Sequence, residues 1–104
     1  MKYEKLVRDK ILEIIKADGR EAKTRILNDE EYLIELEKKL REECAEVLAE
    51  RGEHRIEELA DVMEVVKALA EAQGSSMAAV ENAREKKAKK RGGFAQKIFL
   101  IESD

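Results

Sequence analysis

Large apolar residues recur every three or four positions through the middle of the chain, which is the spacing of an amphipathic helix. The repeat consists of Leu33, Leu36, Leu40, Val47 and Leu48. Asn28 precedes it, and Glu31 follows Asn28 by three residues, a pairing that favours a helix N-terminus. These residues predict a long helix that begins near Asp29 and ends near Gly52, because glycine favours helix termination.

Three further helices are predicted around this one from the same kind of apolar periodicity. Their segments are residues 6–15, 53–72 and 76–90, and the glycines that would end them are Gly19, Gly74, Gly92 and Gly93. Proline is absent and only four residues are aromatic, a composition typical of helical proteins. We therefore expect an all-α bundle of about four helices, forming one domain over residues 1–104.

The end of the chain changes periodicity. Phe94, Ile98 and Leu100 are separated by even numbers of residues, which is typical of extended backbone. Residues 97–101 are accordingly predicted to form a short strand that pairs with residues 23–27, the aliphatic stretch before the long helix.

The chain is short of large apolar side chains. Of its 45 hydrophobic residues, 13 are alanine, so a single copy has little with which to fill a core. We expect self-association into a homodimer or homotetramer.

Charge and hydropathy exclude several classes of partner. The 21 Lys and Arg against 24 Asp and Glu give a net charge of −3, so no overall positive field attracts nucleic acid or anionic lipid. The longest stretch without a charged residue, Ala72 to Val80, is nine residues long and cannot span a bilayer. With no apolar run after the first lysine and a single cysteine, Cys44, we expect a soluble protein of the reducing cytoplasm.

Acidic residues on the long helix lie close to its apolar stripe. At 100° per residue, Glu43 lies about 60° and Glu46 about 120° from Leu40, whereas Glu42 lies about 160° away and faces outward. On the next helix, Glu58 lies about 150° and Asp61 about 90° from the middle of the solvent face.

A carboxylate against apolar surface needs a cation, a metal or a proton to offset its charge. If the two helices pack antiparallel, the pairs Glu43 with Glu46 and Glu58 with Asp61 face each other, and four hard oxygen ligands suit magnesium, with manganese as the alternative. The other interpretation is that these acids are ordinary solvated groups, because Asp and Glu occupy about a quarter of all positions.

A basic run near the end of the last helix is the candidate for binding an anion. Lys87 and Arg91 share a helix face, and the following glycines allow backbone N–H groups to approach a phosphate. The alternative is a solvated helix end that complements the helix dipole. His54, the only histidine, is interpreted as a surface residue, and Cys44 as a small core residue.

Three segments together resemble the MazG-like all-α nucleoside triphosphate pyrophosphohydrolases, a superfamily that includes phosphoribosyl-ATP pyrophosphohydrolase. They are the opening Lys5-Leu6-Val7-Arg8-Asp9-Lys10-Ile11, the acids Glu42-Glu43-x-x-Glu46 with Glu58-x-x-Asp61, and the closing Lys87-x-x-x-Arg91-Gly92-Gly93-Phe94. The chain is most similar to the small house-cleaning members that open with this segment.

The resemblance implies Mg²⁺ bound by Glu43, Glu46, Glu58 and Asp61. It also implies hydrolysis of a nucleoside triphosphate, which we expect to be a non-canonical one, to a monophosphate and pyrophosphate. Glu42, or a ligand such as Glu46, would accept the proton of the attacking water. Lys87 and Arg91 would neutralise the pyrophosphate. Arg8 and Lys10 are candidates for a second anion contact, or alternatively part of a surface salt-bridge cluster.

Two other functions compete with this one. The first is phosphoribosyl-ATP pyrophosphohydrolase activity in histidine biosynthesis. The second is a non-catalytic helical interaction protein, whose acids bind nothing.

Overall fold

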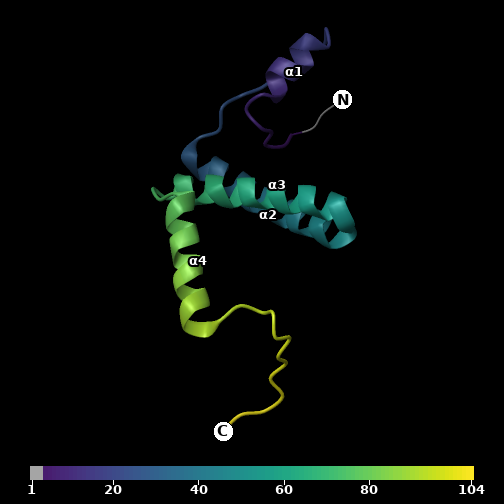
Figure 1. Cartoon of the computed structure of the whole chain (residues 1–104). Coiled ribbons are helices and arrows are strands. Elements are labelled where there is room, and N and C mark those ends of the chain that lie inside the picture. Colours follow the sequence, from purple (N-terminus) through teal and green to yellow (C-terminus); the bar gives the residue numbers. More distant parts are fainter. Residues whose placement is uncertain (1–3) are drawn as a thin grey trace.

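The computed structural model describes residues 4–104 and consists of four α-helices joined by irregular segments (Figure 1). In chain order these are α1 (Ile11–Ala17), α2 (Asp29–Ala49), α3 (Gly52–Ala72) and α4 (Met77–Arg91). The described residues contain no β-strand, so the predicted all-α class is confirmed. No helix among residues 4–104 is both long enough and apolar enough to cross a membrane.

The two long helices form an antiparallel hairpin that holds the core (Figure 1). Leu36 of α2 and Ala70 of α3 are the buried hydrophobic residues, at 3% and 6% exposure. At the closed end of the hairpin, the Nε–H of Arg55 donates to the carbonyls of Val47 and Glu50, both at 2.9 Å. The bond to Val47 satisfies a carbonyl that the end of α2 would otherwise leave unpaired, and both bonds tie the start of α3 to the end of α2.

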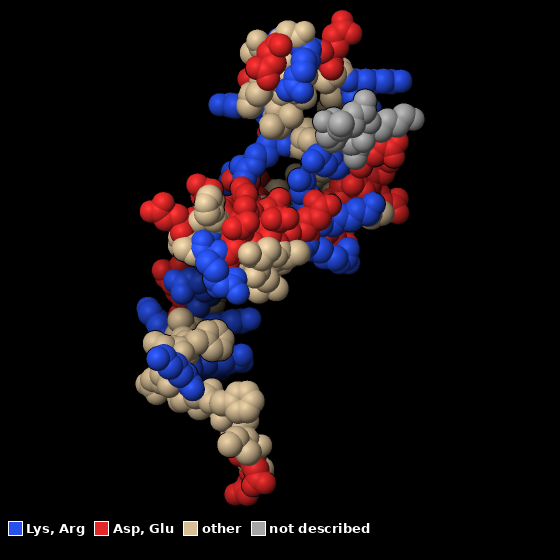
Figure 2. Space-filling model, turned by 90° about the vertical axis from the view of Figure 1, so that its right-hand side faces the viewer, with Lys and Arg blue, Asp and Glu red and all other residues tan. Residues whose placement is uncertain are grey.

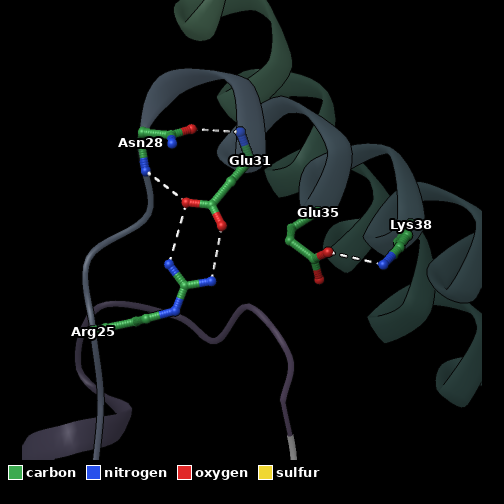
Figure 3. A network of polar contacts seen from close by, with 5 residues as sticks. All are labelled: Arg25, Asn28, Glu31, Glu35 and Lys38. Carbon is green, nitrogen blue, oxygen red and sulfur yellow. Dashed lines mark hydrogen bonds and ion pairs between the residues drawn. The ribbon is translucent and has the colours of Figure 1, made fainter.

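The predicted start of α2 is confirmed by a complete capping box (Figure 3). The backbone N–H of Glu31 donates to Asn28 Oδ1 at 2.8 Å, and the backbone N–H of Asn28 donates to Glu31 Oε1 at 3.3 Å. Arg25 adds two hydrogen bonds to the same Glu31 carboxylate, at 2.9 and 3.2 Å. The Arg25 guanidinium and then the Asn28 N–H lower the pKa of Glu31, because both stabilise its ionised form.

The first helix is shorter than the sequence predicted. It begins at Ile11 rather than at Leu6, and Lys10 stands at its N-cap without a side-chain hydrogen bond. A helix this short has little stability of its own. The segment before it instead extends toward the hairpin, where Arg8 forms an ion pair with Asp61 of α3.

The predicted pairing of residues 23–27 with 97–101 is wrong. Neither segment is a strand, and Ile26 of the first and Ile98 of the second are more than 80% exposed. The reason is topological: residues 23–27 lead into α2, whereas α4 carries the end of the chain away from the hairpin (Figure 1). A turn closed by the Lys97 N–H and the Phe94 carbonyl, with Lys97 at φ +61°, also interrupts the extended run.

The single chain is open. Its radius of gyration is 18.0 Å, against about 13 Å for a compact domain of this length. Its accessible surface is 9752 Å², against roughly 5900 Å² for a compact monomer of 11.9 kDa. The expected shortage of core is therefore evident in the fold, and self-association stays a prediction.

The capping box generates a test of how α2 is stabilised. Replacing Asn28 by Ala removes the side-chain acceptor of the Glu31 N–H, so the free energy of unfolding should fall by about 1 kcal/mol. Urea unfolding followed by circular dichroism, at a fixed protein concentration, measures this. Asn82→Ala, an exposed position inside α4, is the matched control and should be neutral or slightly stabilising.

Candidate functional site

The α2–α3 hairpin brings together carboxylates from both helices. Glu43 of α2 and Glu58 and Asp61 of α3 each offer one oxygen, and these three oxygens lie within 4.8 Å of one another. All three residues are half-buried. We call these three residues the acidic cluster. They are three of the four metal ligands that the sequence predicted, and the antiparallel packing that places them together was also expected.

The fourth predicted ligand, Glu46, lies outside the acidic cluster and is exposed on α2. It still acts on the cluster electrostatically. Partial burial raises the pKa of Glu58, and the negative charges of Asp61, Glu46, Glu43 and Glu50 raise it further, in that order. Carboxylates that repel one another in this way favour binding of a proton or a cation.

Two basic side chains partly neutralise the acidic cluster. The Arg8 Nη2–H donates to Asp61 Oδ1 at 2.7 Å, and Lys39 Nζ lies 4.0 Å from Glu43 Oε1 within α2. No comparable pair is present for Glu58 among the described residues. The site therefore holds three carboxylates against two nearby cations, and the one carboxylate with a raised pKa is the one that lacks a cationic partner.

The Arg8 contact joins residues 53 positions apart, and no local pattern in the sequence indicates it. Arg8 was predicted either to contact an anion or to take part in a surface salt-bridge cluster. In the structure it binds a carboxylate of the acidic cluster. Lys39 was also missed, although its position four residues before Glu43 is a standard helical ion-pair spacing.

The remaining predicted site residues lie outside the acidic cluster. Glu42, a candidate general base, is exposed on α2, and Lys10 is exposed at the N-cap of α1. Lys87 and Arg91 are on α4, which leaves the hairpin at the end of α3 (Figure 1). Lys87 and Arg91 thus lie on a different helix from the predicted metal ligands, whereas Arg8 contacts one of them.

Two smaller predictions have opposite outcomes. His54 is a surface residue as expected, with 78% of its side chain exposed and Nδ1 4.0 Å from Glu57. Cys44, expected in the core, is exposed, so that prediction is wrong. It lies about 80° around α2 from the buried Leu36, at the edge of the packed stripe, and the hairpin buries only the centre of that stripe.

Comparisons with known proteins add a partial sequence relative. Over 58 residues the chain is 47% identical to an uncharacterized protein of Mycolicibacterium smegmatis. The aligned region covers 48% of this chain and 59% of that protein. No protein-family profile matches the chain, and no solved structure matches it.

The raised pKa of Glu58 predicts a pH-dependent effect of its removal. Above its folded-state pKa the ionised Glu58 costs stability, and this cost disappears as the pH falls toward 4.5, the ordinary value, because the folded protein takes up the proton first. In buffer with EDTA, Glu58→Gln should therefore raise the Tm at pH 7.5, and the gain should vanish near pH 4.5.

The matched control for this test is Glu64→Gln, an exposed acid on the same helix. Its effect on the Tm should be small and independent of pH. Both profiles are measured by differential scanning fluorimetry. Equal pH profiles for the two variants would show that the ionised Glu58 does not destabilise the folded chain.

Proposed function

We propose that the chain is a Mg²⁺-dependent nucleoside triphosphate pyrophosphohydrolase of the cytoplasm, which hydrolyses a non-canonical nucleotide to a monophosphate and pyrophosphate in a house-cleaning role. The observation that carries the proposal is the convergence of Glu43, Glu58 and Asp61 from two helices. The resemblance of the opening, acidic and closing segments to MazG-like pyrophosphohydrolases supports the choice of reaction.

The donor set suits a hard divalent cation. It consists of carboxylate oxygens, which Mg²⁺ and Mn²⁺ prefer. Two oxygens on opposite sides of Mg²⁺ lie about 4.2 Å apart, because each bond is about 2.1 Å long. Since the cluster oxygens lie within 4.8 Å, small side-chain movements are enough to close them on an ion, and Glu46 is the nearby acid that would complete the set.

A bound Mg²⁺ would supply positive charge to the phosphate oxygens and acidify the attacking water. Around it, the chain's own groups have distinct roles in the proposal. Glu43, Glu58 and Asp61 would hold the ion, and Glu42 or Glu46 would accept the proton of the attacking water. Arg8 donates a hydrogen bond to Asp61, and its guanidinium would be free to contact a phosphate if a cation took its place at that carboxylate.

The basic side chains of α4 supply the other half of the chemistry in this proposal. Departure of pyrophosphate builds negative charge on oxygens, and positioned cations lower the energy of that state. Lys87 and Arg91 lie one helical turn apart on α4, and the Gly92 N–H donates to the Ala88 carbonyl, so this N–H is not free to contact a phosphate. Lys10 is the candidate for a further contact.

Removing a cluster carboxylate tests the metal assignment. Glu43→Gln or Asp61→Asn should lower Mg²⁺-dependent pyrophosphate release by at least about 100-fold while leaving the helical circular dichroism spectrum intact, because each variant loses a ligand charge. Glu64→Gln should retain the wild-type rate. Full activity in either cluster variant across a screen of canonical and modified nucleotides would disprove the metal site.

Replacing Arg91 separates phosphate binding from metal binding. Arg91→Ala leaves all cluster carboxylates in place, so the rise in Tm on Mg²⁺ titration should match the wild type, whereas turnover should fall by about 100-fold. Lys16→Ala, which removes an exposed basic residue of α1, is the control and should change neither quantity. Normal turnover of Arg91→Ala would show that the end of α4 is only a solvated helix terminus.

A further inference from the structure

The segment before α1 reaches the hairpin without being packed into it. The contacts between helices are those of α2 with α3 and of α3 with α4, so α1 packs on none of the other three within the described residues. None of residues 4–10 is buried, and in that stretch only Leu6 is even half-buried. Figure 1 shows α1 standing apart from the two long helices. Apolar packing therefore contributes little to the position of this segment, which depends mainly on polar contacts.

Arg8 joins this segment to the acidic cluster. Its Nη2–H donates to Asp61 Oδ1 at 2.7 Å, and 60% of the Arg8 side chain and 39% of the Asp61 side chain are exposed. An ion pair between partners that water reaches favours the paired state by roughly fivefold at most. A stronger competitor for the Asp61 carboxylate can therefore replace Arg8 without unfolding any helix.

The other cation beside the acidic cluster is fixed in place. Lys39 Nζ lies 4.0 Å from Glu43 Oε1, and the two residues are one turn apart on α2, so the helix keeps them together whatever the cluster binds. Arg8 lies 53 positions from Asp61, on a segment that no helix packing holds. Of these two cations, Arg8 is the one that can leave.

A divalent cation at the acidic cluster would change the electrostatics of Arg8. The three carboxylates carry a formal charge of −3 when ionised, and an ion of charge +2 among them reduces this to −1. The attraction of the guanidinium to the cluster then falls, and the ion itself repels it. A phosphate group is the better partner in that state, because a guanidinium can donate two parallel N–H bonds to it, whereas the structure shows one bond to Asp61.

We propose that Arg8 is an exchangeable counter-ion of the acidic cluster: it binds Asp61 while the cluster is empty, and a divalent cation at the cluster releases it, with the segment before α1, to bind a phosphate group of the substrate. This inference rests on the proposed function for the identity of the cation and of the phosphate. It adds a coupling between them. Because such coupling is reciprocal, Arg8 weakens binding of the cation alone by the factor by which the cation weakens the Arg8–Asp61 pair. With phosphate present the sign reverses, so the chain favours cation and phosphate together.

The guanidinium N–H signals of arginine in ¹H–¹⁵N spectra of the full chain test the release directly. The Arg8 signal is identified by its loss in Arg8→Gln. On titration with MgCl₂ at constant ionic strength it should move to the position that it has in metal-free Asp61→Asn, because both changes remove the same partner. Arg84, which pairs with Glu81 on α4 at 2.6 and 2.8 Å, is the control in the same spectrum and should not move. Backbone amide signals show whether each variant is folded.

Calorimetry measures the coupling. Arg8→Gln should bind Mg²⁺ alone about two- to fivefold more tightly than the wild type, which is the size expected for an exposed ion pair. In the presence of Mg²⁺ it should bind inorganic pyrophosphate roughly tenfold more weakly, because a charged phosphate donor is lost. Arg20→Gln, which removes an exposed ion pair with Asp18 at 3.2 Å, is the matched control and should change neither constant.

The outcomes separate this proposal from the proposed function. An Arg8 signal that stays in place when the rise in Tm with Mg²⁺ is complete would overturn the exchange, and so would weaker Mg²⁺ binding or unchanged pyrophosphate binding by Arg8→Gln. Release of Arg8 by Mg²⁺ in a protein that hydrolyses no nucleotide of the screen would instead refute the pyrophosphohydrolase function alone. A protein whose Tm and spectra do not respond to Mg²⁺ would overturn both.

Discussion

Antiparallel packing of α2 against α3 is the interaction on which the rest of the structure depends. It buries Leu36 and Ala70, and Arg55 fixes the closed end through its bonds to Val47 and Glu50. That register decides which carboxylates meet. A shift of one residue along a helix turns each side chain by about 100°, so the oxygens of the acidic cluster would no longer converge.

The same packing concentrates negative charge, which is partly neutralised by Lys39 within α2 and by Arg8 from outside the hairpin. The effect is evident at Glu58, whose pKa is raised by partial burial and then by four neighbouring acids. Arg8, in the segment before α1, forms an ion pair with Asp61. Basic residues instead gather near the end of α4, which leads away from the acidic hairpin (Figures 1 and 2). They are Lys86, Lys87, Lys89, Lys90 and Arg91. The acidic and basic residues, which are separate along the chain, are therefore also separate in space.

Helices and their ends could be predicted from local pattern because their causes are local. The capping box of Asn28 and Glu31 lies within four residues, and the apolar spacing of α2 and α3 selects the face that packs. The convergence of Glu43, Glu58 and Asp61 could be predicted from helix face, because the short turn between α2 and α3 favours antiparallel packing. The strand pairing failed since even spacing in residues 94–100 carries no information about where α4 points.

The sequence by itself determined the all-α class, the bounds of the three longer helices to within a few residues, and the candidates for the carboxylate site, because side-chain periodicity and capping act over a few residues. Tertiary structure alone decided that Arg8 meets Asp61, that Cys44 is exposed, and that Lys87 and Arg91 stand apart from the acids. Each of these depends on the direction of one element relative to another, which is set by packing between residues distant in the chain.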